Sequence, residues 1–423
     1  MFRRLSNTLP PDPTFPTDLD KLGYFVNEND LIRQKANPKQ GYQYKINRSE
    51  RVNDAYKEAM NACSRKIVLE RLLELGLQEL PLPLNVTRDT KHVPILVSKD
   101  LATKKHIIVL FPDRQNDPGI LAYRVLGQEG INIGSVINLV KAILGQSSTT
   151  PDATLSQHIE TPGLVIANPS QLIWYRRGAR PVTDREWLCL PRPSAVHEAM
   201  RIDEVENRVE GNKNFREHIQ YIFEHVLCTN DGEPVICCPE AKFSIIGQEY
   251  VGSEVMQYLT NNWLGWRNRI NCVALINPQH ELSELFSTFD LTAPGDIAEK
   301  EEIVNFIAKR TRAYRLSQRP LETLLTGRRK LGCNIYAAGE IYYEESCLIR
   351  CWPSVLDWIE LCRVSDTFAE PAFDINLSDD EEAEPKIRSP RRNGRPLTEE
   401  EQGNVRFHGN MEVTETGTVA KAE

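Results

Sequence analysis

The residues from Ile245 to Val255 are the ones whose types and spacing are best suited to chemistry. They form a short apolar run, a turn bounded by glycines and the start of a helical pattern: Ile245-Ile246-Gly247-Gln248-Glu249-Tyr250-Val251-Gly252-Ser253-Glu254-Val255. A strand, a sharp turn and a helix in this order present the nucleophile of many hydrolytic enzymes, in a strained turn called the nucleophile elbow. The segment therefore predicts such an elbow, with an ordinary strand-to-helix turn as the alternative.

Six residues make up the predicted elbow: Gly247, Gln248, Glu249, Tyr250, Val251 and Gly252. An elbow needs small residues two positions before and two positions after its nucleophile. Gly247 meets the first requirement, but Val251 occupies the second position and Gly252 comes one residue later. Glu249 stands at the nucleophile position, where a carboxylate can react, yet it has an extra methylene and no paired base in this segment. We therefore expect the elbow to be degenerate.

A hydrolase with this elbow also needs a histidine base after its last strand. The eight histidines are His92, His106, His158, His197, His218, His225, His280 and His408. The last predicted strand is 333–337, so this base would be expected in the region that follows it. No histidine lies between Leu331 and Arg363. Without a serine nucleophile or this histidine we expect no Ser-His-Asp mechanism and no enzymatic activity. The alternative is an active hydrolase or esterase that uses a non-standard constellation.

Metal and cofactor chemistry have little support in the sequence. His280-Glu281-Leu282-Ser283-Glu284 resembles a zinc-protease helix, but glutamate replaces the second histidine that such a site needs. The ten cysteines form no CxxC pair and do not combine with histidines at zinc spacing. We therefore expect buried thiols, no metal site and no cofactor.

Buried strands and helices alternate along the body of the chain. Apolar runs predict strands at 92–97, 106–111, 164–167, 243–246, 272–276 and 333–337. Helical spacing predicts helices at 54–76, 136–144, 214–227, 254–263 and 355–362. This alternation predicts a three-layer α/β fold with a mostly parallel central sheet of the α/β-hydrolase kind.

The composition predicts three segments: a disordered leader at 1–12, one domain at 13–367 and a disordered charged tail at 368–423. The net charge of −8 argues against a protein that reads duplex DNA. No apolar run is long enough to span a membrane, and no signal peptide is recognisable at the start.

A basic segment follows the acidic stretch from Glu281 to Glu302. Besides Lys309, its candidate patch consists of Arg310, Arg312, Arg315, Arg319, Arg328, Arg329 and Lys330. One interpretation is that the acidic and basic stretches neutralise each other on the surface. The other is an exposed patch that makes weak contacts with RNA phosphates or with an acidic partner.

The tail carries two short motifs. Ile375, Leu377 and Ser378 precede a run of acids and resemble a SUMO-interacting motif, which would add a strand to a sheet edge. A basic cluster of the nuclear-localisation type follows, with Lys386, Arg388, Arg391 and Arg392. These motifs favour the nucleus, with the cytoplasm as a second location, and solvated disorder is the alternative for each motif.

Several blocks along 13–365 resemble the Argonaute-binding Arb-two domain family in its fungal branch. The blocks are 15–19, 22–30, 42–45, 168–175, Gly211-Asn212, 217–219 and 336–340. This resemblance implies an α/β-hydrolase-like fold and a role in chromatin silencing. Relatives include an Argonaute partner that acts with small interfering RNA and a domain appended to a fungal histone deacetylase. Other relatives keep a His-Ser-x-Gly-Gly elbow, which aligns with Gln248 to Gly252. The resemblance predicts a scaffolding protein with Argonaute or histone-deacetylase partners.

Overall fold

The computed structural model describes residues 9–145, 161–194, 196–228, 235–290, 292–372, 391–392 and 395–396. The chain divides into two compact units, Met1–Phe373 and Asp374–Glu423. In the second unit the described residues are two short antiparallel strands, β14 (Arg391–Arg392) and β15 (Arg395–Pro396).

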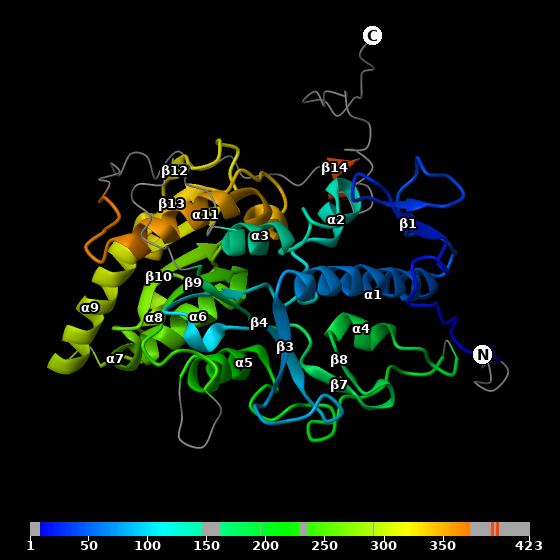
Figure 1. Cartoon of the computed structure of the whole chain (residues 1–423), viewed down its shortest axis with the longest axis horizontal. Coiled ribbons are helices and arrows are strands. Elements are labelled where there is room, and N and C mark those ends of the chain that lie inside the picture. Colours follow the sequence, from blue (N-terminus) through cyan, green and yellow to red (C-terminus); the bar gives the residue numbers. More distant parts are fainter. Residues whose placement is uncertain are drawn as a thin grey trace, which may run out of the picture. The chain divides into compact units, whose positions relative to one another are not determined.

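A nine-stranded sheet forms the centre of the first unit (Figure 1). Its order is β12-β13-β11-β10-β9-β5-β6-β4-β3. The strands are β3 (Leu77–Leu82), β4 (Val93–Ser98), β5 (His106–Phe111), β6 (Gly163–Ile166), β9 (Lys242–Gln248), β10 (Ile270–Ile276), β11 (Thr311–Arg315), β12 (Leu324–Leu325) and β13 (Asn334–Ala337). The six strands from β6 to β13 in this order are parallel, whereas β3, β4 and β12 join in antiparallel pairs.

The order of these strands confirms the predicted fold class. Apart from β12, the sheet has eight strands, from β3 at one end to β13 at the other. If these strands are numbered by their order in the sequence, their order across the sheet is 1-2-4-3-5-6-7-8. The second of them, β4, is antiparallel to both neighbours. This is the arrangement of the α/β-hydrolase fold, and it places the ends of β5, β9, β10, β11 and β13 along one edge.

Helices cover both faces of the sheet and complete three layers (Figure 1). The helices are α1 (Glu50–Glu74), α2 (Tyr123–Glu129), α3 (Ile137–Gly145), α4 (Asp184–Cys189), α5 (Phe215–Tyr221), α6 (Glu249–Asn261), α7 (Trp263–Trp266), α8 (Leu282–Leu285), α9 (Pro294–Arg310), α10 (Arg328–Leu331) and α11 (Cys347–Val364). Helices α1, α3 and α11 share one core with the sheet, and α5, α6 and α9 share the other. A π-helical turn, Ile222–Val226, continues α5.

Strand β5 illustrates why the sheet lies between two cores. Its side chains alternate between the faces, so Ile108 and Leu110 pack with α1, α3 and α11. Ile107 and Val109 pack on the opposite face with α5 and α6. A strand that is apolar at every position needs helices on both sides, because both of its faces must leave water. The continuous apolar run therefore predicted this layer correctly.

Two hairpins lie outside the large sheet. One consists of β1 (Tyr24–Val26) and β2 (Ile32–Gln34), and the other of β7 (Ile173–Tyr175) and β8 (Arg180–Val182). The first hairpin is attached to α1 through aromatic side chains, since the Tyr56 hydroxyl donates to that of Tyr24 at 3.0 Å and Tyr42 stacks on Tyr56. These tyrosines belong to or contact the N-terminal blocks on which the family resemblance rests.

The ordered domain extends beyond the predicted boundaries. Asp12, assigned to the leader, accepts a hydrogen bond from the backbone N–H of Arg192 and pairs with Arg51. Glu370, assigned to the tail, is buried and pairs with Arg312 at 2.5 Å. Composition could not place these ends because single charged residues anchor them. No helix in the described part of the chain is long and apolar enough to cross a membrane.

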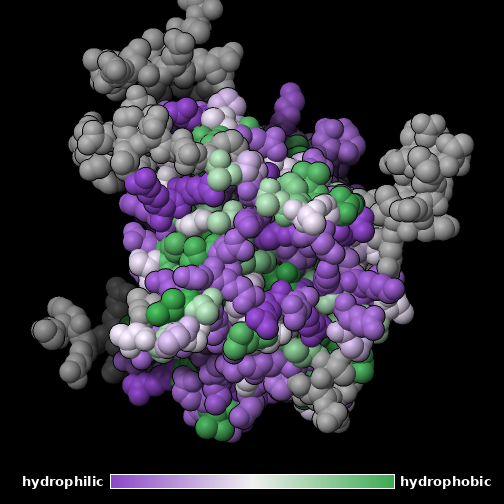
Figure 2. Space-filling model, turned by 90° about the vertical axis from the view of Figure 1, so that its left-hand side faces the viewer, coloured by the Kyte–Doolittle hydropathy of each residue, from purple (hydrophilic) through white to green (hydrophobic). Residues whose placement is uncertain are grey.

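The face that Figure 2 shows carries hydrophobic residues in several separated groups among hydrophilic ones. Exposed large apolar residues of the domain are also scattered over different elements, for example Leu264 on α7, Ile297 on α9 and Leu361 on α11. Scattered apolar residues are normal for a protein surface and do not by themselves mark a docking site. Ligand sites of open α/β sheets lie instead at the carboxyl ends of the strands.

Candidate functional site

The turn between β9 and α6 has the backbone of a nucleophile elbow. Strand β9 ends at Gln248, and α6 begins at Glu249, whose φ is +47°. This left-handed conformation is strained for a residue with a side chain, and such strain concentrates at functional turns. Glu249 therefore occupies the nucleophile position of an elbow. The predicted helix start at Glu254 was too late, because the elbow residues themselves form its first turn.

Two glycines allow this turn to close, although one is not where the sequence analysis required it. A Cβ atom on Gly247 would lie 2.6 Å from Cα of Gly252, and a Cβ on Gly252 would lie 2.7 Å from the carbonyl carbon of Gly247. Val251, at the position expected to be small, is buried in the core beside α5. The second small residue is thus needed three positions after Glu249. The turn thus has the backbone conformation of an elbow, with Glu249 at its tip and the second glycine one position later than expected.

The Glu249 side chain lies in an acidic and mostly dry environment. The residue is 7 % exposed, and its carboxyl group has no hydrogen-bond partner among the described residues. Burial, together with the nearby carboxylates of Asp113, Glu344 and Glu345, raises the pKa of Glu249 to about 8. Because the charged form is disfavoured by both desolvation and like charges, the group is mainly a neutral acid at pH 7.

Acidic side chains also follow two other strands of the sheet, β5 and β13. Asp113 follows β5 and accepts from the backbone N–H of Gln115 at 3.1 Å, and burial raises the pKa of Asp113. Glu340 follows β13, where a hydrolase would carry its histidine. Its carboxylate accepts from the backbone N–H of Ile341 at 2.9 Å and of Tyr342 at 3.0 Å. The loop after β13 therefore carries an acid whose carboxylate is fixed by the backbone of its own loop.

None of the six histidines in the described ranges contacts the Glu249 carboxyl. His106 and His280 bond to the hydroxyls of Ser244 and Ser253, and His197 to that of Ser194. His92 bonds to the carbonyl of Thr90, and His218 bonds to Asn168 and Asn212. His225 stacks on the ring of Tyr221. His158 and His408 lie outside the described residues.

The pair of Ser253 and His280 is a feature that the sequence analysis missed. Nδ1 of His280 lies 3.1 Å from the Ser253 hydroxyl, which also donates to the carbonyl of Glu249 and accepts from the N–H of Gln279. Both side chains are buried, and burial lowers the pKa of His280 to about 4. His280 thus serves this contact, while Glu281 caps α8. No group of three or more His, Cys, Asp or Glu in the described part of the protein could hold a metal ion.

A pocket of about 440 Å³ lies beside the elbow, at the ends of β5 and β6. Its lining consists of Arg114, Gln115, Pro169, Ser170, Leu172, Ile173, Thr183, Asp184, Arg185, Arg208, Lys213, Asn214 and Phe215. Arg114 connects the pocket to the elbow, because its guanidinium lies 5.4 Å from the ring centre of Phe215 and 5.8 Å from that of Tyr250. Four cations face one acid in this lining. We call it the cationic pocket.

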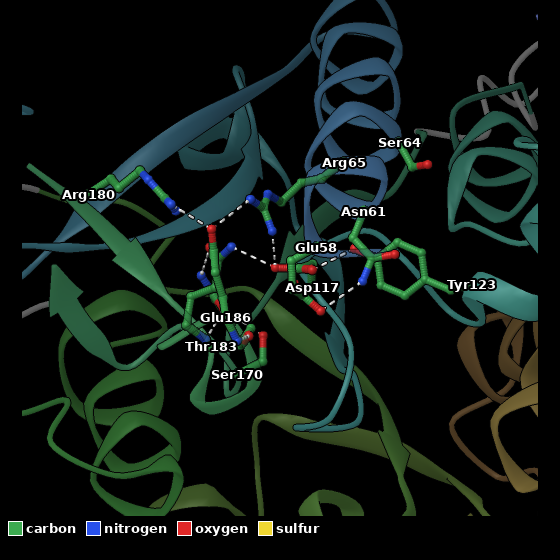
Figure 3. Close-up of polar contacts among 12 residues, drawn as sticks. Glu58, Asn61, Ser64, Arg65, Asp117, Tyr123, Ser170, Arg180, Thr183 and Glu186 are labelled. Carbon is green, nitrogen blue, oxygen red and sulfur yellow. Dashed lines mark hydrogen bonds and ion pairs between the residues drawn. The ribbon is translucent and has the colours of Figure 1, made fainter. Parts of the chain in front are cut away.

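A buried polar network supports one side of this pocket (Figure 3). Arg65 on α1 pairs with Asp117 at 2.6 Å and lies 3.6 Å from Glu186 on α4. Arg180 on β8 also pairs with Glu186, at 2.6 Å. Burial and the neighbouring carboxylates of Asp117 and Glu186 raise the pKa of Glu58 to about 7. Because buried ion pairs must be matched to remain favourable, this network fixes α1, α4 and β8 relative to one another.

Three of the family-like blocks meet at the wall of the cationic pocket. Nε2 of His218 accepts from the backbone N–H of Asn168 at 2.9 Å, and its Nδ1 lies 2.6 Å from the Asn212 side-chain oxygen. Gln171 donates to Asp117 at 2.9 Å and so joins the same wall to the buried network. Burial lowers the pKa of His218 to about 3, so the ring is neutral and Nδ1 carries its proton. The blocks are distant in sequence but form one hydrogen-bonded unit.

The basic segment does not form one continuous exposed patch. Arg310 donates to the carbonyls of Cys362 and Asp366, and Arg312 pairs with Glu370. Arg315 donates to the carbonyl of Pro278 at 3.1 Å. Arg310 and Arg312 are therefore neither exposed as a patch nor paired with the acids from Glu281 to Glu302. They contact α11 and the residues that follow it. The remaining members include the exposed residues Arg319, Arg329 and Lys330.

The tail motifs lie mainly outside the described residues. This applies to the SUMO-type motif at Ile375, Leu377 and Ser378 and to Lys386 and Arg388 of the basic cluster. Arg391 and Arg392 form the short strand β14. The interpretation of both motifs therefore stays a prediction.

Comparison with known proteins identifies the family. The family model of the Arb2 domain matches residues 15–321. No curated protein matches the sequence. The similar solved structures include a histone deacetylase from Saccharomyces cerevisiae, with 12% identity, a TM-score of 0.40 and coverage of 72% of this chain and 97% of that one. They also include the peroxisomal α/β-hydrolase Lpx1 from Saccharomyces cerevisiae, with 9% identity, a TM-score of 0.32 and coverage of 72% and 92%. The esterase Est22 has 10% identity, a TM-score of 0.34 and coverage of 76% and 90%. Since the family model spans well over half of the sequence, this chain belongs to the Arb2 domain family.

Proposed function

We propose that this protein is a catalytically degenerate α/β-hydrolase-like domain that acts by binding or scaffolding other proteins. The observation that carries the proposal is the chemistry at Glu249. An elbow carboxyl with a pKa of about 8 is mainly protonated at neutral pH, and attack on a carbon centre needs the deprotonated form. No described histidine is placed to take its proton. The strained turn is kept without the groups that would use it.

The alternative is an active hydrolase with a non-standard constellation. It has two candidate nucleophiles, Glu249 and the hydroxyl of Ser253 beside His280. The Ser253 hydroxyl is engaged in three internal contacts, with Glu249, Gln279 and His280. A nucleophile needs a base and a third group that orients the base. Neither candidate has that set among the described residues, which favours the binding role.

We place this binding role in nuclear, small-RNA-linked heterochromatin silencing, with Argonaute or histone-deacetylase machinery as partners. Membership of the Arb2 domain family supports this context, and the cytoplasm remains a second location. The negative net charge and the internal use of Arg310 and Arg312 favour protein partners over RNA. A weak RNA contact stays the lesser alternative, through the cations that remain exposed.

Affinity capture of the full-length tagged protein from nuclei tests this proposal. We expect an Argonaute or a histone deacetylase among the proteins enriched over an untagged control. The Glu249→Gln variant should recover the same partners in equal amounts, because scaffolding does not use a nucleophile. Loss of the partners in a folded Glu249→Gln variant, or enrichment of neither protein class, would contradict the proposed role.

A further inference from the structure

Three cations around the cationic pocket have no acidic partner. Arg114, Arg185 and Lys213 line the pocket, and none of their side chains forms an ion pair within the described ranges. All three are exposed at the pocket surface. By contrast, Arg65 and Arg180 just behind the wall are paired with carboxylates. The charges that build the wall are thus matched, whereas those that face the pocket are not.

A fourth cation, Arg208, also lines the pocket, but unlike the other three it lies within ion-pair distance of an acid, Glu204. The Arg208 side chain is largely buried, and one of its terminal nitrogens donates to the carbonyl of Leu172 at 3.3 Å. Its buried Nε has no hydrogen-bond partner in the described structure and lies 3.8 Å from Glu204. A buried donor without a hydrogen bond is costly, which is why such groups often mark a ligand or water position. The one acid in the lining is Asp184.

The four cations are held on separate, fixed segments that converge on the pocket. Arg114 lies in the loop after β5, Arg185 on α4, and Arg208 and Lys213 in the segment before α5. Hydrogen bonds from the His218 ring fix the turn at Asn168 to that segment. The positions therefore need little rearrangement on binding, which lowers the entropic cost of binding. The pocket also lies at the carboxyl ends of parallel strands, where α/β folds bind ligands.

The lining indicates the chemical class of the ligand. Arginine and lysine side chains are the usual partners of phosphate oxygens, and hydroxyls such as those of Ser170 and Thr183 can add hydrogen bonds. A phosphoryl dianion matches several unpaired cations better than a single carboxylate does. Pro169, Leu172 and Ile173 form an apolar wall for a carbon skeleton. The volume of about 440 Å³ lies within the range of small-molecule pockets.

We propose that the cationic pocket binds a small organic phosphomonoester, with Arg114, Arg185 and Lys213 around the phosphoryl group. The Arg114 guanidinium already covers the rings of Phe215 and Tyr250, so those rings do not serve as a stacking platform for the ligand. Charge and the apolar wall hold the ligand instead. This site is independent of the proposed scaffolding role, because it uses neither the Glu249 carboxyl nor a protein partner.

Calorimetric titration of the full-length protein at low salt tests the site. The probes are inorganic phosphate and adenosine monophosphate, with adenosine as the uncharged control. We expect saturable binding of one adenosine monophosphate, weaker binding of phosphate and no binding of adenosine. Arg114→Gln, Arg185→Gln and Lys213→Gln should each weaken binding by roughly tenfold, the value of one charge-assisted hydrogen bond. The triple variant should lose binding.

A matched control distinguishes this site from general attraction to positive charge. The double change Arg329→Gln and Lys330→Gln removes exposed cations from α10 and should leave binding unchanged. The double variant Arg185→Gln and Lys213→Gln should keep the thermal midpoint of the unliganded wild type, because neither side chain has an ion pair or a ring contact to lose among the described residues, whereas Arg114→Gln also removes contacts with the rings of Phe215 and Tyr250. No saturable binding of either phosphate would overturn the proposal. Equal weakening by the α10 control, or binding of single-stranded RNA but not of adenosine monophosphate, would also overturn it.

Discussion

The elbow and the cationic pocket are neighbours at the carboxyl ends of the strands, yet their side chains carry opposite charge. The loop after β5 serves both, since Asp113 adds negative charge near Glu249 while the next residue, Arg114, lines the pocket. The turn after β9 also serves both, because Glu249 is the elbow residue and Tyr250 lies under the Arg114 guanidinium. Acids crowd one site and unpaired cations line the other.

This difference shows that the backbone geometry of a site and the side chains needed for its chemistry are set separately. The elbow geometry persists because two backbone segments meet at Gly247 and Gly252, whatever side chain Glu249 carries. Its chemistry depends on a few groups, and the acids beside Glu249 favour a neutral carboxyl. In the pocket the backbone has no unusual strain at Arg114 or Lys213, but the cations there lack partners. A strained backbone alone therefore does not identify the site that binds a ligand.

The strongest test of the acidic environment is the pH dependence of stability. Because the pKa of Glu249 is about 8 when folded and about 4.5 when exposed, the unfolded chain loses its proton first as pH rises. Stability should therefore fall between pH 5 and pH 8. Glu249→Gln removes this titratable group. Its effect on the free energy of unfolding should therefore be about 3 kcal/mol more favourable at pH 8 than at pH 5. Urea denaturation at both pH values measures the difference.

The Glu249→Gln variant should keep part of the wild type's decrease in stability with rising pH. Burial also raises the pKa of Asp113, and the pKa of Glu58 is about 7. These groups act in the same direction as Glu249, so the variant should flatten the curve without levelling it. An identical slope in the two proteins would mean that the Glu249 carboxyl is ionised in the folded state, and the contrast between the two sites would be lost.

The backbone of the elbow should be sensitive to a single methyl group. Gly252→Ala places a Cβ 2.7 Å from the carbonyl carbon and oxygen of Gly247, which backbone atoms cannot relieve cheaply. We expect a loss of about 3 kcal/mol in the free energy of unfolding. Gly127→Ala on α2 is the matched control, because its Cβ meets nothing within 4 Å, and it should be neutral or stabilising. Equal effects of the two changes would contradict the close packing at the elbow.

The wall of the cationic pocket should depend on His218. His218→Leu leaves the N–H of Asn168 and the side-chain oxygen of Asn212 without their partner in a buried place. We expect a loss of about 2 kcal/mol, the cost of unpaired buried polar groups. Thermal and urea unfolding measure the loss. His197→Leu, which removes a contact with Ser194 from a less buried ring, should cost less. A larger effect of His197→Leu would contradict the structural role of His218.

The smallest effect is expected in the basic segment. The triple change of Arg328, Arg329 and Lys330 to glutamine alters one partly buried and two exposed residues on a short helix. It should shift the free energy of unfolding by less than about 0.5 kcal/mol. A gel shift with single-stranded RNA at two salt concentrations should show at most a weak complex that salt dissolves. Tight, salt-resistant binding would mean that this segment, and not the pocket, is the main anion site.

The sequence predicted the architecture well because periodicity reports local burial. Continuous apolar runs located β5 and β10, and the glycine at position 76 marked the end of α1. Strand β11 was missed, since it combines arginines with buried residues, and the sequence appeared merely basic there. Arg312 is tolerated in that strand because it pairs with Glu370. This pairing could not be predicted, because the composition assigned Glu370 to the tail.

The candidate sites were predicted only in part. The elbow was located because its glycines and strand are contiguous in sequence, although the spacing of its small residues was misjudged. The cationic pocket was not predicted, because its residues come from segments as far apart as Arg114 and Lys213 and show no common motif. The family-like blocks around Asn168, Asn212 and His218 were the one available signal, since they build its wall.

The most direct test of the central claim measures ester hydrolysis by purified full-length protein. A panel of short-chain and aromatic esters should give no turnover above that of heat-denatured protein. Glu249→Gln and Ser253→Ala should give the same background, and Glu249→Ser should create no activity because the elbow lacks a histidine base. Turnover by the wild type that disappears in Glu249→Gln would contradict the account and identify a carboxylate nucleophile.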